Sequence, residues 1–139
     1  MLAKDALITG IGKFPKNERI LDGLMQLYTA EEGVGDPADL VTLIDSAIAD
    51  NPENVDLWFG RGRIFYALKN YDESIASFKK VVELKPDLFE GNYYLGVFYT
   101  IKADEMNKVM NEKQYSSQTA YDTDLKEVNA VYMEAVPWF

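Results

Sequence analysis

The sequence predicts an all-α fold in which antiparallel helix pairs stack into a right-handed α-solenoid of about seven helices. Three observations support this prediction. Prolines recur at a nearly constant interval, with 34 residues from Pro52 to Pro86 and 37 from Pro15 to Pro52. The chain also matches itself at a shift of 34, which pairs Gly62 with Gly96. Apolar residues recur in steps of three and four, the spacing that places them on one helix face.

The proline intervals divide the chain into four segments. A residue that precedes proline is disfavoured in the helical region, so each proline ends one helix pair and begins the next. We expect a partial repeat in residues 1–15, a repeat with a short insertion in 17–52, the best-matching repeat in 54–87 and a last repeat in 88–139. The first segment reads as a second helix without its first, and the last segment stops short. We therefore expect a fragment of a longer repeat array.

The first two segments are expected to contain three helices. Residues 2–14 and 17–32 should form the first two, and the apolar stripe of the second consists of Leu21, Leu24, Met25 and Tyr28. A third helix should begin after Asp36, because this residue can cap it and Pro37 suits its first turn. The buried face expected for this third helix consists of Leu40, Ile44, Ala47 and Ile48.

The central segment should form two amphipathic helices of about 14 residues each, with a polar turn at Lys69 and Asn70 between them. Gly62 has no side chain, so the second helix can approach its backbone closely. The large side chains expected to fill the seam are Trp58, Phe65, Tyr71 and Phe78.

The last segment should form a long antiparallel hairpin. Asp87 is expected to cap its first helix, with Glu90 three residues further on. Its two apolar stripes consist of Leu95, Tyr99, Lys102 or Ala103, Met106 and Met110, and of Tyr121, Leu125, Val128, Tyr132, Ala135 and Phe139. Their steps of three and four predict a coiled-coil-like seam with its turn in residues 113–118. The extra residues, at about 103–130, should extend the hairpin by roughly 14–20 Å. Pro137 should kink the returning helix near Met133.

This pattern resembles the tetratricopeptide repeat. The central segment reads Trp58-x-x-Arg61-Gly62-x-x-Phe65, then Ser74-x-x-x-Phe78 and Pro86. That family has an aromatic-x-x-Leu-Gly-x-x-Tyr helix followed by an Ala-x-x-x-Phe helix and a proline. Arg61 departs from the pattern, where leucine is usual, as do Ser74 and Val81, where alanine is usual. The packing residues that the resemblance implies are Tyr28, Trp58, Gly62, Phe65, Phe78, Pro86, Leu95, Gly96, Tyr99, Ala135 and Phe139.

The composition argues against several functions. The net charge of -9 disfavours nucleic acid, which needs a basic face. The chain contains no cysteine and no histidine, and so lacks thiol nucleophiles and the commonest general base and metal ligand. No apolar run approaches the roughly 18 residues that indicate a membrane span. We expect no catalysis, cofactor, metal or membrane insertion. The sequence favours a soluble cytoplasmic protein, or an exported one if a signal peptide has been removed.

Three motifs with chemical associations are better interpreted structurally. Gly10-Ile11-Gly12-Lys13 lacks the first glycine and the hydroxyl residue of a phosphate loop, and is expected to be a helix end. The run Gly60-Arg61-Gly62-Arg63 lies on a strongly periodic helix, unlike an RNA-binding tract. The acids Glu31, Glu32, Asp36 and Asp39 do not match a calcium-binding loop and indicate a solvated turn followed by a helix cap.

The resemblance implies a scaffold that binds another protein. The first helices of successive pairs line a concave face, where members of this family usually hold a partner's peptide or helix. The groove residues implied here are Arg19, Asp22, Gln26, Asp56, Phe59, Arg63, Tyr66, Glu90, Tyr93 and Val97. Phe59, Tyr66 and Tyr93 would form an exposed aromatic row suited to anchoring a partner, unless they pack between adjacent repeats. The cationic clamp that some members use to hold a C-terminal carboxylate is absent.

The alternative function is architectural. The hairpin of residues 95–139, or the apolar ends of the array, could mediate self-assembly into a homo-oligomer, because free repeat ends need polar caps to stay soluble. The apolar residues at the two ends are Leu2, Leu7, Ile8 and Ile11, and Val136, Trp138 and Phe139. The sequence thus indicates a protein-binding role and leaves the binding surface and the partner open.

Overall fold

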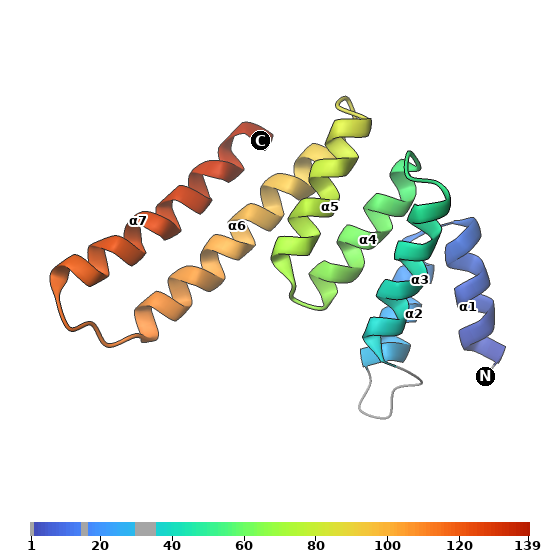
Figure 1. The fold of residues 1–139 in the computed structure, drawn as a ribbon, viewed down its shortest axis with the longest axis horizontal. Helices are drawn as coiled ribbons and strands as arrows, with labels where there is room; N and C mark the ends of the chain where they lie inside the picture. The colour runs from blue at the N-terminus through green and yellow to red at the C-terminus, as the bar shows by residue number, and fades with distance from the viewer. Residues whose placement is uncertain (1, 15–16, 30–35) are drawn as a thin grey trace.

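The computed structural model describes residues 2–14, 17–29 and 36–139, and these form seven α-helices and one short 3-10 helix, with no strand (Figure 1). The elements are α1 (Leu2–Lys13), α2 (Glu18–Thr29), α3 (Pro37–Asp50), α4 (Val55–Ala67), α5 (Tyr71–Leu84), α6 (Phe89–Glu112), α7 (Gln118–Ala135) and η1 (Val136–Trp138). The predicted all-α class is therefore confirmed.

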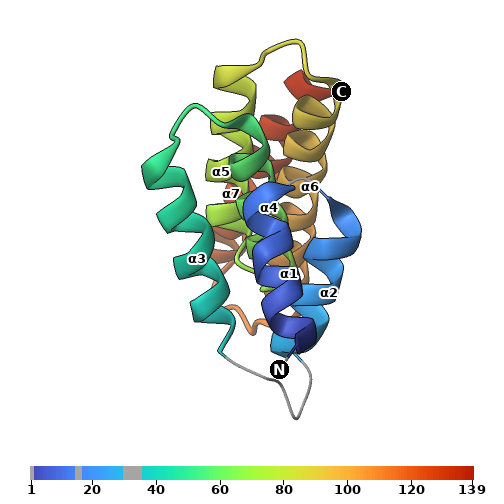
Figure 2. The same cartoon turned by 90° about the vertical axis from the view of Figure 1, so that its right-hand side faces the viewer.

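The helices stack in chain order. α4 packs against α5, α5 against α6 and α6 against α7, while α2 contacts α1, α3 and α4. Seen end-on, α3 and α5 lie on one side of the stack and α2 and α6 on the other (Figure 2). Each helix thus buries its apolar face against its neighbours rather than around a common centre. This arrangement is that of an α-solenoid, as the sequence predicts.

The hydrophobic core follows the stack as two clusters that meet at α4. The cluster built from α1 to α4 contains Ile11, Leu24, Leu40, Ile44, Ile48, Leu57 and Ile64. The cluster built from α4 to α7 contains Phe59, Ile75, Phe78, Val81, Leu95, Phe98, Tyr99 and Ala135. The indole of Trp58 packs against both clusters, so α4 couples the two halves of the molecule.

Side chains cap the starts of several helices. Asp36 Oδ1 accepts a hydrogen bond from the Ala38 amide at 2.9 Å, and Pro37 occupies the first turn of α3, as expected. Asn54, Asn70 and Ser117 cap α4, α5 and α7 in the same way. The buried face expected on α3 is also present, because Leu40, Ile44 and Ile48 are at most 7% exposed. On α2, Leu24 is fully buried, whereas the side chains of Leu21, Met25 and Tyr28 lie outside the described residues, as do Glu31 and Glu32.

The turn between α4 and α5 depends on Lys69, which has a φ of 58°. The Asn70 amide donates to the Phe65 carbonyl at 2.9 Å, and the Lys69 amide donates to the Tyr66 carbonyl at 2.9 Å. This pair of bonds defines a Schellman motif, in which a left-handed residue satisfies the last carbonyls of a helix. The turn predicted at Lys69 and Asn70 therefore exists, although it uses a lysine where glycine would be less strained.

α6 and α7 form the long hairpin predicted for the last segment, and its outer half extends away from α4 and α5 (Figure 1). α6 has 24 residues and α4 has 13, and the difference corresponds to about 16 Å of additional helix. Ala103, Met110, Val128 and Ala135 are buried in the seam. Lys102 lies outside the seam and forms an ion pair with Asp72 on α5.

Two expectations for the ends of this hairpin are wrong. Asp87 does not cap α6, since the residue at the cap position is Leu88 and no side chain caps the helix there. Pro137 does not kink α7 near Met133, because α7 ends at Ala135 and continues as η1. Pro137 has no amide hydrogen to donate to the Met133 carbonyl four residues earlier. The Val136 amide donates to that carbonyl instead.

Candidate functional site

Aromatic side chains form a continuous row from α4 to α6. The Tyr66 ring stacks on Phe98 with 4.8 Å between centroids, and Phe98 stacks on Tyr94 at 5.7 Å. The row continues from Tyr94 to Tyr93 at 5.7 Å and from Tyr93 to Phe89 at 5.9 Å. We call these five residues the aromatic face. Their separations are those of stabilising ring pairs, so each ring supports the next.

The aromatic face has a buried base and an exposed rim. Phe98 is 2% exposed and belongs to the core, whereas Tyr66 is 38%, Tyr93 45% and Phe89 73% exposed. A single exposed aromatic residue is ordinary, but a contiguous row of them is a feature of interaction sites. Tyr66, Tyr93 and Phe89 therefore offer apolar area to a partner without requiring the core to open.

Arg63 adds a positive charge beside this row. Its guanidinium carbon lies 5.6 Å from the centroid of the Tyr94 ring, and its Nη1 donates to the Tyr94 hydroxyl at 3.2 Å. A guanidinium keeps its charge at every physiological pH and has several donors in a fixed plane. Arg63 therefore helps to hold Tyr94 in place within the row.

The groove residues implied by the sequence come from three helices. Arg19 and Gln26 on α2, Asp56 on α4 and Glu90 on α6 are exposed, and Val97 on α6 is half-buried. The side chain of Asp22 lies outside the described residues. The structure brings Tyr66 and Tyr93 into one aromatic row through Phe98 and Tyr94, whereas no ring contact links that row to α2 among the described residues.

The expectation that Phe59 is exposed is wrong. Phe59 is 2% exposed, and its ring meets Phe78 edge-on at 5.0 Å and Tyr94 edge-on at 5.5 Å. It thus packs between α4, α5 and α6, which is the alternative that the sequence left open. Alanine at this position would test the stability of the core rather than the binding of a partner.

Two glycines hold the helix pairs together in the same way. A Cβ atom added to Gly62 would lie 2.5 Å from Phe78 Cδ2, and one added to Gly96 would lie 3.0 Å from Phe139 Cζ. Of the remaining implied packing residues, Phe65, Leu95, Tyr99 and Ala135 are buried and Trp58 is half-buried, while Pro86 is exposed. Phe139 differs from them, because it covers Gly96 with one edge and stays 74% exposed.

Arg61, which departs from the repeat pattern, has a structural role. Its Nε pairs with Asp45 on α3 at 2.7 Å, and its Nη2 pairs with Glu73 on α5 at 2.9 Å. Nη1 donates to Ser77 Oγ at 2.8 Å, and the guanidinium carbon lies 4.5 Å from the Phe65 ring centroid. Arg61 thus joins three helices where the usual leucine would join them only by packing.

Phe89, Tyr94 and Phe98 are the members of the aromatic face that sequence reasoning missed. Phe89 occupies the first position of α6, where the preceding repeat has Val55, and it lies outside the positions that the repeat pattern uses for packing. A large aromatic residue with no assigned packing role was the available signal. Tyr94 carried no such signal, because its contacts with Arg63 and Phe59 arise only when α4 and α6 are placed side by side.

The described residues contain no group of three or more acidic side chains arranged to hold a metal ion. None of their helices is both long enough and apolar enough to cross a membrane.

A comparison with protein families found that residues 29–88 match the model of the tetratricopeptide repeat. This segment includes α3, α4 and α5, and it ends just before α6 begins. No curated protein and no solved structure matches the chain.

Proposed function

Since residues 29–88 match the tetratricopeptide repeat, and such repeats generally mediate protein–protein interaction, we propose that this chain binds a peptide or helix of a partner across the aromatic face. Members of the family are typically non-catalytic interaction modules. The proposed role is therefore that of a scaffold, with the partner bound by α4 and α6.

The observation that supports this proposal is the exposed rim of Tyr66, Tyr93 and Phe89. Binding energy at protein interfaces is concentrated in a few large side chains, among which tyrosine and arginine are prominent. Tyrosine suits this role because its large ring has few rotatable bonds and its hydroxyl can still donate or accept a hydrogen bond. Tyr66 stacks on the buried ring of Phe98, and Tyr93 is joined to that ring through Tyr94, so these two rings should lose less entropy when a partner binds.

Charged side chains on the same helices would select and orient the partner. Asp56 and Arg63 lie on α4 and Glu90 lies on α6; Arg63 contacts Tyr94 in the middle of the aromatic row, and Glu90 directly follows Phe89 at one end of it. Because both signs are present, we propose that these residues fix the direction of the bound peptide rather than attract one class of charge. Arg19, Asp22 and Gln26 on α2 would contact a partner long enough to continue past α4.

The proposal is tested by selecting binders from a displayed peptide library and mapping the bound peptide by NMR. The triple variant Tyr66→Ala, Tyr93→Ala and Phe89→Ala should lose binding at least tenfold while it keeps its helical circular dichroism. Phe14→Ala is the matched control, since Phe14 is an exposed aromatic residue at the end of α1. Binding that survives the triple variant, or amide shifts confined to other helices, would refute the aromatic face.

A second candidate is self-assembly, favoured by one specific observation. Met133 is 67%, Val136 60% and Phe139 74% exposed, and these apolar residues lie at the end of α7 and just beyond it. Sedimentation over a wide concentration range would measure this association. The variant Met133→Glu with Phe139→Glu should then abolish it, whereas a chain that stays monomeric at high concentration removes this candidate.

A further inference from the structure

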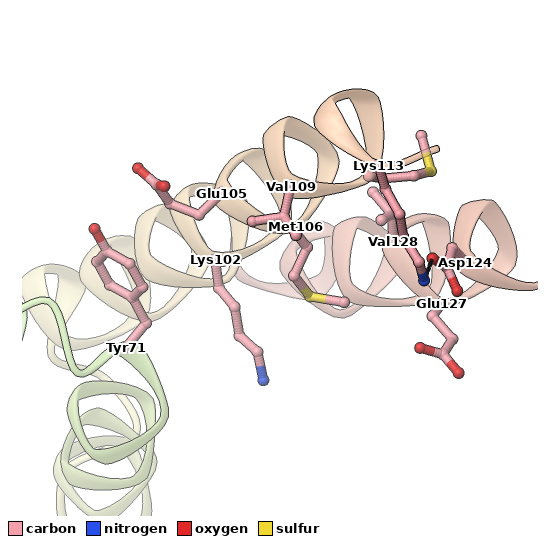
Figure 3. A pocket seen from close by; sticks show the side chains of 10 residues that line it. Tyr71, Lys102, Glu105, Met106, Val109, Lys113, Asp124, Glu127 and Val128 are labelled. Atoms are coloured by element: carbon pink, nitrogen blue, oxygen red, sulfur yellow. Dashed lines mark hydrogen bonds and ion pairs between the residues drawn. The ribbon is translucent and has the colours of Figure 1, made fainter. Parts of the chain in front are cut away.

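A groove of about 450 Å³ lies on the long hairpin, between the outer halves of α6 and α7 and the start of α5 (Figure 3). Its wall at the inner end is Tyr71, the first residue of α5, whose own helix does not continue along the hairpin. No member of the aromatic face lines this groove. It is therefore a separate surface, and it is of a size that binding sites commonly have.

The floor of the groove is apolar. Met106, Val109 and Met110 on α6 and Val128 on α7 line it. Val109 is 64% exposed, whereas Met110 and Val128 are almost fully buried, so the floor is supported from below and open above. Methionine side chains are flexible and polarisable and adapt to the shape of an apolar partner.

The two lysines of the groove are neutralised by the chain itself. Lys102 Nζ lies 2.5 Å from Asp72 Oδ1, and Lys113 Nζ lies 2.6 Å from Asp124 Oδ2. Glu105 on α6 and Glu127 on α7 also line the groove, and neither forms an ion pair with another described residue. Figure 3 places these two carboxylates at opposite ends of the groove. The unbalanced charge around the apolar floor is therefore negative at both ends.

From this charge pattern we propose that the groove binds a basic amphipathic helix of a partner protein. An apolar stripe on the partner would cover Met106 and Val109, and lysine or arginine residues near the two ends of the stripe would pair with Glu105 and Glu127. Helices commonly enter grooves in this way, using anchors three and four residues apart. Lys102 and Met110 are eight residues apart on α6, or about 12 Å, so two to three turns of the partner fill the groove.

The charge of the chain distinguishes this occupant from a second copy of the same protein. A second copy would bring a chain with the same net charge of -9 against this acidic groove, whereas a basic helix is attracted to it. An acidic helix would place like charges against Glu105 and Glu127. The partner is thus identified by its chemistry: an apolar helix face bordered by cations.

The test uses a synthetic amphipathic peptide of about four turns with a leucine stripe and lysines on its polar face, matched by a peptide with glutamate in place of lysine. Calorimetry on the whole chain should detect the lysine peptide and not the glutamate peptide. The double variant Glu105→Lys with Glu127→Lys should weaken binding of the lysine peptide at least about tenfold. Val109→Asp, at an exposed floor position, should weaken it as well without unfolding the chain.

The control must separate this groove from general attraction between a cation and an acidic protein. Asp50→Lys with Glu53→Lys makes the same change in net charge at exposed residues near the end of α3. This control should keep the affinity within about threefold of the parent. The triple variant Tyr66→Ala, Tyr93→Ala and Phe89→Ala should also leave the affinity for the lysine peptide unchanged. The test of this groove is therefore independent of the test of the aromatic face. The proposal would be overturned if the lysine peptide did not bind. It would also be overturned if the Glu105→Lys, Glu127→Lys variant and the Asp50→Lys, Glu53→Lys control lost affinity equally.

Discussion

Asn92 makes with Pro86 the same hydrogen bond that Trp58 makes with Pro52. Trp58 Nε1 donates to the Pro52 carbonyl at 2.8 Å, and Asn92 Nδ2 donates to the Pro86 carbonyl at 2.8 Å. The two donors are 34 residues apart, as are the two prolines. The repeat thus preserves a physical relationship between the proline turn and the helix after it, although the residue that makes the bond is an indole in one copy and an amide in the other.

Replacing Asn92 should weaken the last repeat. Its side-chain amide donates to the Pro86 carbonyl and also to the Leu88 carbonyl at 3.0 Å, and alanine would leave both acceptors without it. We expect Asn92→Ala to lower the free energy of unfolding by about 1–2 kcal/mol, measured by urea denaturation. Asn92→Asp has nearly the same shape but no donor, and should cost at least as much. An aspartate variant as stable as the parent would show that the hydrogen bonds are not the reason.

The self-match at 34 residues predicted the helix pairs correctly because burial of apolar faces determines both the period and the fold. The stripes at Leu40, Ile44 and Ile48, and at Met110 and Val128, needed no knowledge of neighbouring helices. The burial of Phe59 could not be predicted in the same way. It depends on Tyr94, which lies 35 residues further along the chain and covers Phe59 only because α4 and α6 lie close together.

Gly62 and Gly12 should respond in opposite directions to alanine. A Cβ atom at Gly62 would overlap the ring of Phe78, which is fully buried and has no space to move. Gly62→Ala should therefore destabilise the protein by about 2 kcal/mol, even though alanine favours helix. Gly12, in α1, has no atom within 4 Å of its added Cβ, so Gly12→Ala should stabilise by up to about 1 kcal/mol. Thermal and urea unfolding of both variants measure the contrast, and a stabilised Gly62 variant would contradict the close approach.

Lys69→Gly should stabilise the turn between α4 and α5. Lys69 adopts a left-handed conformation that costs an ordinary residue about 1–2 kcal/mol, and glycine avoids most of this cost while making the unfolded chain somewhat more flexible. We expect a net gain of up to about 1 kcal/mol in the free energy of unfolding. Lys85→Gly is the control, because Lys85 ends α5 with φ at -145° and should gain nothing. A loss of stability in Lys69→Gly would show that the lysine side chain contributes to the turn.

Polar contacts across helices were the least predictable features of the chain. Nothing in the spacing of Arg61 indicates that Asp45, Glu73 and Ser77 all lie within reach of its guanidinium, because these partners come from α3 and α5. The helix caps at Asp36 and Asn54 involve residues two or three positions apart, and such local bonds can be read from sequence. Asp87 shows the limit of that reasoning, since a suitable capping residue preceded α6 and the helix began one position later.

Arg61→Ala should destabilise the protein by about 2 kcal/mol, because it removes two ion pairs, a hydrogen bond to Ser77 and the packing of the side chain on Phe65. Asp45→Ala is the comparison that isolates one ion pair, and its cost should stay below about 1 kcal/mol since Asp45 is half exposed and screened by solvent. Arg61→Leu restores the usual residue of the repeat and should recover most of the loss. Urea unfolding measures all three, and a leucine variant as unstable as the alanine variant would contradict this account.

The contacts of Asp124 and Tyr115 at the tip of the hairpin should stabilise the folded chain only between an acidic and an alkaline pH limit. Hydrogen bonds from Lys113 and from the Tyr115 hydroxyl lower the pKa of Asp124 below its usual value. Partial burial and the bond to Asp124 raise the pKa of Tyr115 to about 12. The pKa of Asp124 is lower in the folded chain than in the unfolded chain. Its contribution to the free energy of unfolding is therefore present above the ordinary pKa near 4 and is lost as the pH falls through the folded pKa. The pKa of Tyr115 is higher in the folded chain than in the unfolded chain. Its contribution to the free energy of unfolding is therefore present below about pH 10 and is lost as the pH rises toward 12.

NMR titration of the Asp124 carboxyl and the Tyr115 ring measures both limits in the same sample. Tyr115→Phe removes one donor to Asp124, so the pKa of Asp124 should rise toward its usual value, and Lys113→Ala should raise it further because Lys113 makes the larger contribution. Tyr93→Phe, on the aromatic face, should leave the titration of Asp124 unchanged. An Asp124 that titrates normally in the parent chain, or that does not respond to either substitution at the tip, would mean that the Lys113–Asp124–Tyr115 contacts do not hold the turn together in solution.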